Sequence, residues 1–557
     1  MKFRYVLAGL LPLLSSCAMN SVGITERGQC DKAAPPLMTL KTAQPVEHSE
    51  IPWWNQSVFY EVFVRSFADS TTGPLACDGI GDIQGLIENL DYLNDGDPAT
   101  TTDLGVNALW LMPIHQSPSY HGYDVVDYYQ VDEEYGTNED FKRLIKAAHS
   151  RGIRIIIDLV LNHASMQHPY FLQGTQPADP YYDWFVWQDK QASYPSGPWQ
   201  QPIWHDASKQ AYYGIFWSGM PDWNYHNPEV TQEMHKVSRY WLEEMGADGF
   251  RLDAIRYLYE EDGKLADLPI THQWLKDYQG LMKSVSPEKM SVGEVWADTS
   301  VVSDYGADEL DLTFQFDLAT AILSGVNAQT SDYIRFAIEE IETYFDPGQY
   351  ATFLTNHDQN RVMSQLFDEQ KAKTAASLLL TLPGVPFIYY GEEIGMTGVK
   401  PDELIRTPMQ WNAGPFAGFS VDKSWQQPND DFEQKNVAIQ SAQGDSLLSH
   451  YRNLIHIRQQ HPALLYGATT MIDSRSDRVM SFMRSSGVEN ILVLINMSRK
   501  AMPVKLKTYE LEEGTYQGVN LWDGTPVEFS VKHREFKISQ LETIEPYGIR
   551  LIRFERN

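Results

Sequence analysis

Basic residues are scarce in this chain relative to acidic ones. Among 557 residues, 44 are Lys or Arg and 74 are Asp or Glu, which gives a formal net charge of −30. Proteins that bind nucleic acid or anionic surfaces use basic patches, so this balance argues against such partners as the main ligand. A neutral or cationic substrate fits the balance better. The length and the 43% of hydrophobic residues predict a large domain with a sizeable core plus a smaller module.

Long apolar runs are also few, and only the one at the start resembles a membrane-directed segment. Residues 1–17, MKFRYVLAGLLPLLSSC, contain two basic residues, a short apolar run and small residues before Cys17. The run is too short for a mature transmembrane helix and predicts an export signal. LSSC (14–17) resembles a bacterial lipobox, which would make Cys17 the lipidated first residue of an envelope lipoprotein, anchored in the outer membrane. The alternative is an ordinary secretory signal with an incidental cysteine.

Cysteine itself is rare, with three in the chain. If Cys17 is lipidated, Cys30 and Cys77 remain, and two cysteines of an exported protein are expected to pair. The alternative is two separate thiols. The disulfide would join residues 18–50, a polar segment that we interpret as a tether, to the first domain.

Eight short apolar segments alternate with helical patterns from residue 51 onward. Residues 138–152, NEDFKRLIKAAHSRG, are a typical helix of this kind. Eight strand–helix alternations predict an α/β fold, a parallel (β/α)8 TIM barrel, formed by residues 51–162 and 229–465. The predicted strands are 58–64, 106–112, 153–160, 247–253, 290–295, 310–316, 350–356 and 385–390.

Two further regions depart from this alternation. Residues 163–228 are rich in Trp, Tyr, Pro and Gly and are far longer than an ordinary loop, so we expect a small inserted domain after the third strand. Residues 466–557 contain short strand patterns separated by turn residues, which predicts a C-terminal antiparallel β-sandwich.

Polar residues recur where the predicted barrel strands end. In ADGFRLDAIRYL (247–258), alternation places Arg251 and Asp253 on one face of the fourth strand. The third strand ends near Asp158, Asn162 and His163, the fifth at Glu294, and the seventh at His357 and Asp358. Each has a structural explanation, such as a cap, a turn or a buried ion pair. However, active sites of such barrels lie at the carboxyl ends of the strands.

A pair of carboxylates on adjacent strands suggests glycoside hydrolysis. One carboxylate acts as nucleophile and the other as proton donor and then base, and in retaining enzymes they lie about 5–5.5 Å apart. Asp253 and Glu294 are the expected pair. Arg251 would lower the pKa of Asp253, whereas packing near Trp296 and neighbouring carboxylates would raise that of Glu294. Asp358, His163 and His357 would bind sugar hydroxyls.

These motifs resemble those of the α-amylase superfamily, glycoside hydrolase family 13, from about residue 51 to the C-terminus. DLVLNH (158–163), GFRLDA (249–254), GEVW (293–296) and FLTNHD (353–358) occur in the family's order. The resemblance implies Asp253 as nucleophile, Glu294 as acid/base and Asp358 as transition-state stabiliser. It also implies that a subsite for the attacked glucose is lined by Tyr123, stacking on the sugar, with His121 and Asp124 nearby, and by His163, Arg251 and His357.

Other motifs bear on specificity within the family. MPDWN (220–224) resembles the MPDLN signature of a group intermediate between oligo-1,6-glucosidases and neopullulanases, which includes lipoprotein-type bacterial α-amylases; Trp223 replaces the expected Leu. IRTPMQWN (405–412) resembles a segment of oligo-1,6-glucosidases and trehalose synthases. Arg406 and Asp124 would close one end of the site, which favours short substrates; the alternative is a loop arginine on the surface.

Calcium is a possible cofactor, and no organic cofactor is expected. The resemblance implies Asn162 as a ligand, although Arg256-Tyr257 stand where many α-amylases have Lys-His, which weakens that site. A second candidate is the loop CDGIGD with Asp78, the carbonyl of Ile80 and Asp82, to which Asp69 would add a ligand. The alternative for this loop is a glycine-rich turn in which Asp82 caps a helix.

The leading hypothesis is therefore a retaining hydrolase of α-1,4-glucosidic bonds in starch or maltodextrins, working as a monomer. Alternatives are an oligo-1,6-glucosidase or α-glucosidase and a transglycosylating relative such as trehalose synthase. From another class, the chain would be a non-catalytic glucan-binding protein on the same fold. Such proteins usually lack one of the three carboxylates, and all three are present here.

Overall fold

The computed structural model describes residues 51–509, 511–539 and 541–556. The predicted signal and tether, and with them the proposed lipidation at Cys17, lie outside this range. Cys77 forms a disulfide, and its expected partner Cys30 also lies outside the described residues. Within the described part of the chain, no helix is long and apolar enough to cross a membrane.

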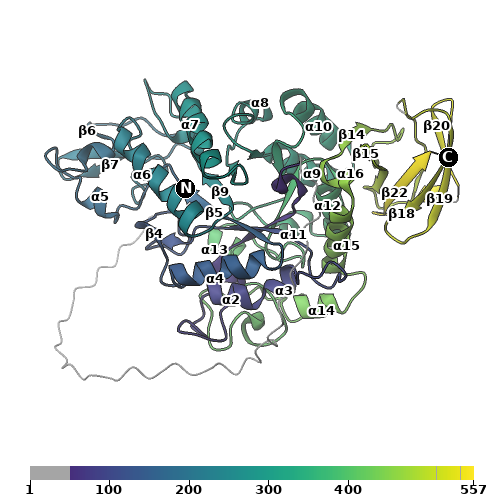
Figure 1. The fold of residues 1–557 in the computed structure, drawn as a ribbon, viewed down its shortest axis with the longest axis horizontal. Helices are drawn as coiled ribbons and strands as arrows, with labels where there is room; N and C mark the ends of the chain where they lie inside the picture. Colours follow the sequence, from purple (N-terminus) through teal and green to yellow (C-terminus); the bar gives the residue numbers. More distant parts are fainter. Residues whose placement is uncertain (1–50, 510, 540, 557) are drawn as a thin grey trace, which may run out of the picture.

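Eight parallel strands close into a barrel, as the sequence predicts (Figure 1). Around the barrel the order is β1, β2, β5, β9, β10, β11, β12 and β13, and β13 pairs again with β1. Every one of these strands falls inside a segment predicted above. Their bounds are β1 Phe59–Val62, β2 Ala108–Leu111, β5 Arg154–Val160, β9 Gly249–Asp253, β10 Met290–Gly293, β11 Leu312–Phe314, β12 Tyr350–Thr352 and β13 Val385–Tyr389.

Helices surround the barrel and bury apolar side chains against it. In α4 (Asn138–His149) the buried residues are Phe141, Leu144, Ile145 and Ala148, which lie on one side of the helix. The Thr137 side chain accepts from the backbone of Asp140 in a capping box that begins α4. The other long barrel helices are α6 Pro228–Arg239, α7 Pro269–Val285, α9 Phe316–Ala328, α10 Asp332–Tyr344, α12 Glu369–Thr381 and α15 Leu447–Gln460.

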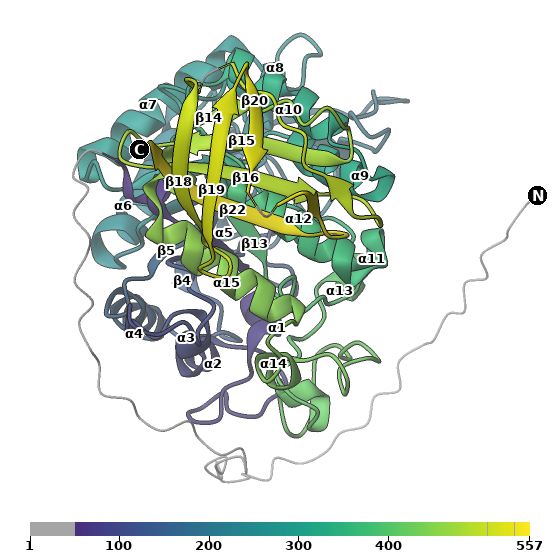
Figure 2. The same cartoon turned by 90° about the vertical axis from the view of Figure 1, so that its right-hand side faces the viewer.

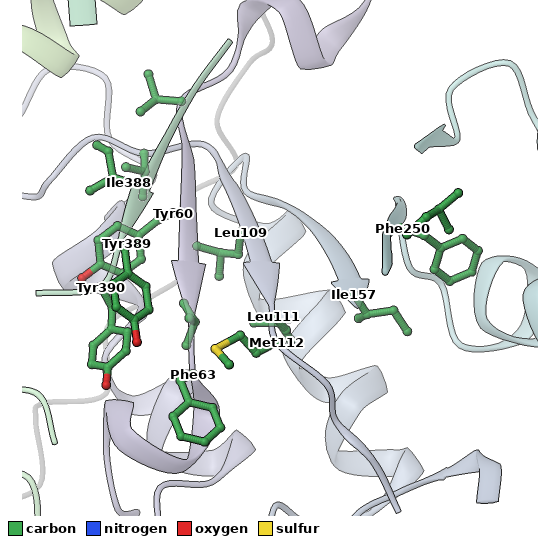
Figure 3. Packing of buried hydrophobic residues seen from close by; sticks show 14 of the residues in the cluster. Tyr60, Phe63, Leu109, Leu111, Met112, Ile157, Phe250, Ile388, Tyr389 and Tyr390 are labelled. Atoms are coloured by element: carbon green, nitrogen blue, oxygen red, sulfur yellow. The ribbon is translucent and has the colours of Figure 1, made fainter. Parts of the chain in front are cut away.

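Strand alternation divides the barrel core into two layers. Phe59, Trp110, Phe314 and Phe387 form part of an inner cluster, and the rings of Phe59 and Phe387 stack with centroids 4.2 Å apart. The intervening residues belong to an outer cluster beneath the helices. Figure 3 shows part of this outer layer, with labelled members on β1, β2, β5, β9 and β13 or directly after them: Tyr60, Phe63, Leu109, Leu111, Met112, Ile157, Phe250, Ile388, Tyr389 and Tyr390.

The insertion after β5 forms a small subdomain at one end of the molecule (left in Figure 1). It contains α5 (Pro169–Leu172) and a three-stranded antiparallel sheet in the order β6-β8-β7. These strands are β6 Trp187–Asp189, β7 Trp204–Ala207 and β8 Gln210–Tyr213. Backbone bridges between His163 and Asp222 bring the two ends of the insertion together at the barrel rim.

The C-terminal region forms a seven-stranded antiparallel sheet at the opposite end, seen face on in Figure 2. One face of this sheet packs on the barrel through residues such as Phe482 and Val493. The other face has its own core, to which Ile544 of the two-stranded sheet β17-β21 contributes. The predicted β-sandwich thus consists of one large and one small sheet. Its strands are β14 Ala468–Met471, β15 Val479–Ser485, β16 Asn490–Asn496, β17 Met502–Pro503, β18 Gly514–Asn520, β19 Pro526–Lys532, β20 Glu535–Ile538, β21 Thr543–Ile544 and β22 Ile549–Arg556.

Candidate active site

Strand β9 places Arg251 and Asp253 on the inner face of the barrel. Phe250 and Leu252, which alternate with them along the strand, belong to the outer apolar layer, so the expected alternation is confirmed. In the register of β5 and β9, Asp158 lies directly beside Arg251. The chain turns sharply after β9, since Ala254 has the left-handed angles φ 50° and ψ 30°.

The guanidinium of Arg251 bridges several carboxylates rather than one. Its Nη1 lies 2.5 Å from Asp253 Oδ1 and 3.0 Å from Asp158 Oδ1, and its Nη2 lies 2.7 Å from Glu294 Oε2. Arg251 is 1% exposed, so these contacts are shielded from water. A single cation that contacts both Asp253 and Glu294 holds their carboxyl groups a few ångström apart. The sequence predicted only the contact with Asp253.

Burial governs the protonation of both carboxyls. It raises the pKa of Asp253, and Arg251 lowers this pKa by less than burial raises it. The expected effect of Arg251, which lowers the pKa of Asp253, is confirmed, but burial outweighs it and leaves the pKa raised. Burial also raises the pKa of Glu294, and Asp253 and Asp358 add to this against the opposing effect of Arg251. Here the predicted direction is confirmed, and so is the expected contribution of the neighbouring carboxylates, whereas Trp296 is 53% exposed.

His357 and Asp358 follow β12 and form a second charged group. His357 Nδ1 donates to Glu61 Oε1 at 2.6 Å, and its Nε2 lies 3.2 Å from Asp358 Oδ2 and 2.7 Å from the hydroxyl of Tyr123. Burial works to lower the pKa of His357, but Asp358 and Glu61 raise it to about 9. Burial alone would raise the pKa of Asp358, yet His357 and Arg406 hold it well below its usual range.

Arg406 completes this group from the loop after β13. Its Nη2 lies 2.9 Å from Asp358 Oδ1 and 3.2 Å from Asp402 Oδ2, and its Nε donates to the carbonyl of His357 at 3.0 Å. Asp402 in turn lies 2.5 Å from Lys400 Nζ. Arg406 is 3% exposed, which rules out the alternative of a surface arginine.

These groups surround a pocket of about 560 Å³ at the carboxyl ends of the strands. Seven of the residues predicted from sequence line it: His121, Tyr123, His163, Asp253, Glu294, Asp358 and Arg406. Arg251 and His357 are not among the lining residues and lie behind the wall, in contact with residues that are. Asp124 is 5% exposed and accepts from the hydroxyl of Ser117 at 2.8 Å, beside His121 rather than on the pocket wall.

Sequence reasoning missed some residues of the site. Glu61 is hidden in the apolar run VFYEVFV, where one signal was available: it lies two positions from Phe59 and so shares its inward face. Trp199, Phe216 and Trp217 of the insertion also line the pocket. They come from irregular segments, whose course no periodicity predicts.

The predicted calcium ligands make hydrogen bonds within the protein. Asn162 Nδ2 donates to Asp222 Oδ2 at 3.0 Å, while Asn162 Oδ1 is buried without a hydrogen-bond partner. Burial raises the pKa of Asp222 to about 8. Within the described ranges, no group of three or more His, Cys, Asp or Glu is placed to hold a metal.

The predicted calcium ligands in the loop after β1 also make hydrogen bonds within the protein. Asp82 Oδ1 accepts from the backbone of Gly85 at 2.7 Å and caps α2 (Ile83–Glu88), as the alternative explanation predicted. Asp69 Oδ2 accepts from the backbone of Gly79 at 2.9 Å, and Asp78 Oδ1 from that of Ile80 at 3.0 Å. Calcium binding in either place stays a prediction.

Comparisons with known proteins agree with this architecture. The family model "Alpha amylase, catalytic domain" matches residues 61–467. The chain is 39% identical over 456 residues to alpha-amylase 3 of Dictyoglomus thermophilum, covering 80% of this chain and 86% of that protein. It is 34% identical over 525 residues to the trehalose synthase/amylase TreS of Mycolicibacterium smegmatis, covering 82% and 86%. The crystal structure of the α-amylase from H. orenii matches with a TM-score of 0.79 and 38% identity, over 90% of this chain and 99% of that one. The chain therefore belongs to the α-amylase family, glycoside hydrolase family 13.

Proposed function

We propose that this protein is a retaining glycoside hydrolase that cleaves α-1,4-glucosidic bonds of starch or maltodextrins. One observation carries the proposal: Asp253, Glu294 and Asp358 face a single pocket, and Arg251 contacts the first two at 2.5 and 2.7 Å. Both carboxyl groups contact one guanidinium, an arrangement compatible with the separation of about 5–5.5 Å that retaining enzymes use.

In the first step, the Asp253 carboxylate attacks the anomeric carbon of the bound glucosyl unit. A bond forms between the Asp253 oxygen and this carbon, and the bond to the glycosidic oxygen breaks. The carboxyl proton of Glu294 passes to that oxygen, so the leaving chain departs as an alcohol. The resulting Glu294 carboxylate lies 2.7 Å from Arg251 Nη2, which stabilises the charge that the proton transfer creates.

In the second step, Glu294 acts as a base. Its carboxylate takes a proton from a water molecule, whose oxygen attacks the anomeric carbon and displaces Asp253 as a carboxylate. The two residues need opposite protonation states at the start of the cycle. Since burial raises both pKa values and both contact one cation, the pair is arranged to share one proton.

Asp358 has a different role, because its pKa is held low by His357 and Arg406. It stays ionised throughout and can bind sugar hydroxyls and offset the positive charge of the oxocarbenium-like transition state. Tyr123, which lines the pocket, would stack on the same sugar, and His163 would bind a hydroxyl. Burial lowers the pKa of His163 to about 4, so its neutral ring can accept as well as donate.

Hydrolysis of α-1,4 bonds is favoured over the alternatives by the higher identity to alpha-amylase 3 than to TreS. Transglycosylation is the second candidate, supported by the segment IRTPMQWN, whose Arg406 lies against Asp358. A non-catalytic glucan-binding protein would have no need for the shared contacts of Arg251. From residues 1–17 we also propose that the protein is exported and is a lipoprotein at the outer membrane, lipidated at Cys17. We further propose that it is a monomer and that Cys30 pairs with Cys77.

Substitution of Glu294 tests the proposal. Glu294→Gln keeps the shape and removes the proton, and we expect hydrolysis of maltoheptaose to fall by about 10²–10⁴-fold with an unchanged circular dichroism spectrum. Glu309→Gln is a control, since Glu309 is also a glutamate that contacts a basic side chain, His272 at 2.9 Å, but lies outside the pocket. Full activity of the Glu294 variant would refute the site assignment. Chromatography of early products would separate maltooligosaccharides, typical of an amylase, from glucose alone or trehalose.

A further inference from the structure

The pocket has two walls of different chemistry. One is charged, with Asp358, Lys400, Asp402 and Arg406 linked by ion pairs. The other, which we call the aromatic wall, is formed by Trp199, Phe216, Trp217 and Tyr257. The mechanism above uses no residue of the aromatic wall.

The aromatic wall is assembled by ring contacts between the insertion and the barrel. Trp199 stacks on Phe216 with centroids 5.7 Å apart and planes at 22°, and meets the edge of Tyr257 at 5.7 Å. Phe216 meets Tyr257 edge to face at 6.1 Å. Trp217 lies so close to Gly219 that a Cβ there would be 2.2 Å from its ring. Only glycine at position 219 permits this placement of the indole.

The two indole rings of this wall are exposed to solvent, although burying them would stabilise the fold. Trp199 is 55% and Trp217 50% exposed, whereas Trp223 in the same insertion is 2% exposed. Exposed apolar surface beside a pocket indicates a binding surface. The wall carries no charge of its own, so it suits a neutral ligand with an apolar face.

Arg256 fixes the position of the wall relative to the acid. Its Nη1 donates to the carbonyl of Trp296, two residues after Glu294, at 2.6 Å, and its guanidinium lies 5.5 Å from the ring centroid of Tyr257. Asp267 binds the same guanidinium, with 3.0 Å between Arg256 Nε and Asp267 Oδ1. The wall and the loop that carries Glu294 are therefore one connected unit. Because Glu294 protonates the leaving oxygen, the leaving group lies on the side of the pocket that the aromatic wall forms.

We propose that Trp199 and Trp217 stack on the glucosyl units of the leaving group and, in the second step, on an acceptor sugar. This inference rests on the proposed function and adds to it the residues that determine chain-length preference and transfer. When a sugar occupies the wall, its hydroxyl replaces water: the proton goes to Glu294, the hydroxyl oxygen bonds to the anomeric carbon, and the bond to Asp253 breaks. The wall therefore favours transfer over hydrolysis.

Two substrates separate this role from the chemistry. Maltoheptaose has a leaving group long enough to reach the wall, whereas α-glucosyl fluoride releases fluoride and leaves the wall empty. For Trp199→Ala and Trp217→Ala we expect kcat/KM for maltoheptaose to fall about tenfold, with α-glucosyl fluoride hydrolysis changed by no more than about twofold. The ratio of transfer to hydrolysis products should also fall. Trp199→Phe and Trp217→Phe, which keep a ring, should recover most of the loss.

Phe336→Ala is the control, because Phe336 is 62% exposed on α10 and outside the pocket. It should leave both substrates and the product ratio unchanged. Equal losses of the two tryptophan variants on both substrates, or no loss on maltoheptaose, would overturn the inference while leaving the proposed function intact. Failure of the unmodified protein to hydrolyse either substrate would overturn the proposed function itself.

Discussion

Replacing Glu61 by Gln would test the charged group beneath the pocket without touching the reacting carboxylates. Glu61 Oε1 accepts from His357 Nδ1 at 2.6 Å, and the two side chains are 2% and 1% exposed. The amide oxygen of Gln can accept the same hydrogen bond, so the substitution removes charge and little else. His357 Nε2 would keep its contacts with Asp358 and with the hydroxyl of Tyr123.

The magnitude follows from the pKa of His357. Burial lowers this pKa, while Asp358 and Glu61 raise it from the ordinary 6.5 to about 9. A rise of about 2.5 corresponds to about 3 kcal/mol of preference for the imidazolium, to which both carboxylates contribute. Removing one of the two charges should lower the pKa of His357 by about 1–2, to about 7–8.

The pH dependence of kcat/KM with α-glucosyl fluoride measures this change. Loss of the imidazolium removes a hydrogen-bond donor to Tyr123 and the positive charge beside Asp358. The alkaline limb of the Glu61→Gln profile should therefore shift to lower pH by as much as the pKa of His357 falls. Proton NMR of the His357 ring would follow the titration directly. Glu309→Gln, which removes the partner of His272 instead, should leave the profile in place. An unshifted alkaline limb in Glu61→Gln would refute the reasoning.

Three further predictions concern charge and metal. Arg406→Met removes the contact at 2.9 Å with Asp358, so the pKa of Asp358 should rise. The acid limb of the pH profile of kcat/KM should then move to higher pH, and an unchanged acid limb would argue against this role of Arg406. The stability that His357 contributes is complete below about pH 6.5 and lost as the pH rises through about 9, so the calorimetric unfolding temperature should fall over this interval, and less in His357→Asn; a rising temperature would contradict the sign. If calcium binds at Asn162 or the Asp82 loop, chelation should lower the unfolding temperature and atomic spectroscopy should find the metal; no metal and no shift would dismiss the prediction.

Strand positions could be predicted because each barrel strand is a short apolar segment between turns. The alternation that sets Arg251 and Asp253 on one face of β9 follows from the period of two in any strand. The same regularity brings Glu294 and Asp358 to one rim, since parallel strands present their carboxyl ends on the same side. These parts of the site depend on position along the chain, which the sequence displays directly.

Features that depend on three-dimensional contact could not be predicted in the same way. Arg251 contacts Asp158 and Glu294 as well as Asp253, and burial raises the pKa of Asp253 by more than Arg251 lowers it. Asp124 lies beside the wall instead of on it, because its carboxylate accepts from Ser117. The position of a loop relative to a strand end, and the depth of burial it produces, are decided by packing across distant parts of the chain.

The central claim is that Asp253 forms a covalent bond to the sugar. Incubation with a ring-fluorinated α-glucosyl fluoride, whose intermediate breaks down slowly, followed by proteolysis and mass spectrometry, tests it most directly. Our account predicts one glycosyl group on the peptide that contains residues 247–258, attached to Asp253, and release of the α-anomer as first product by proton NMR. A label on another residue, or release of the β-anomer with no labelled peptide, would contradict the account.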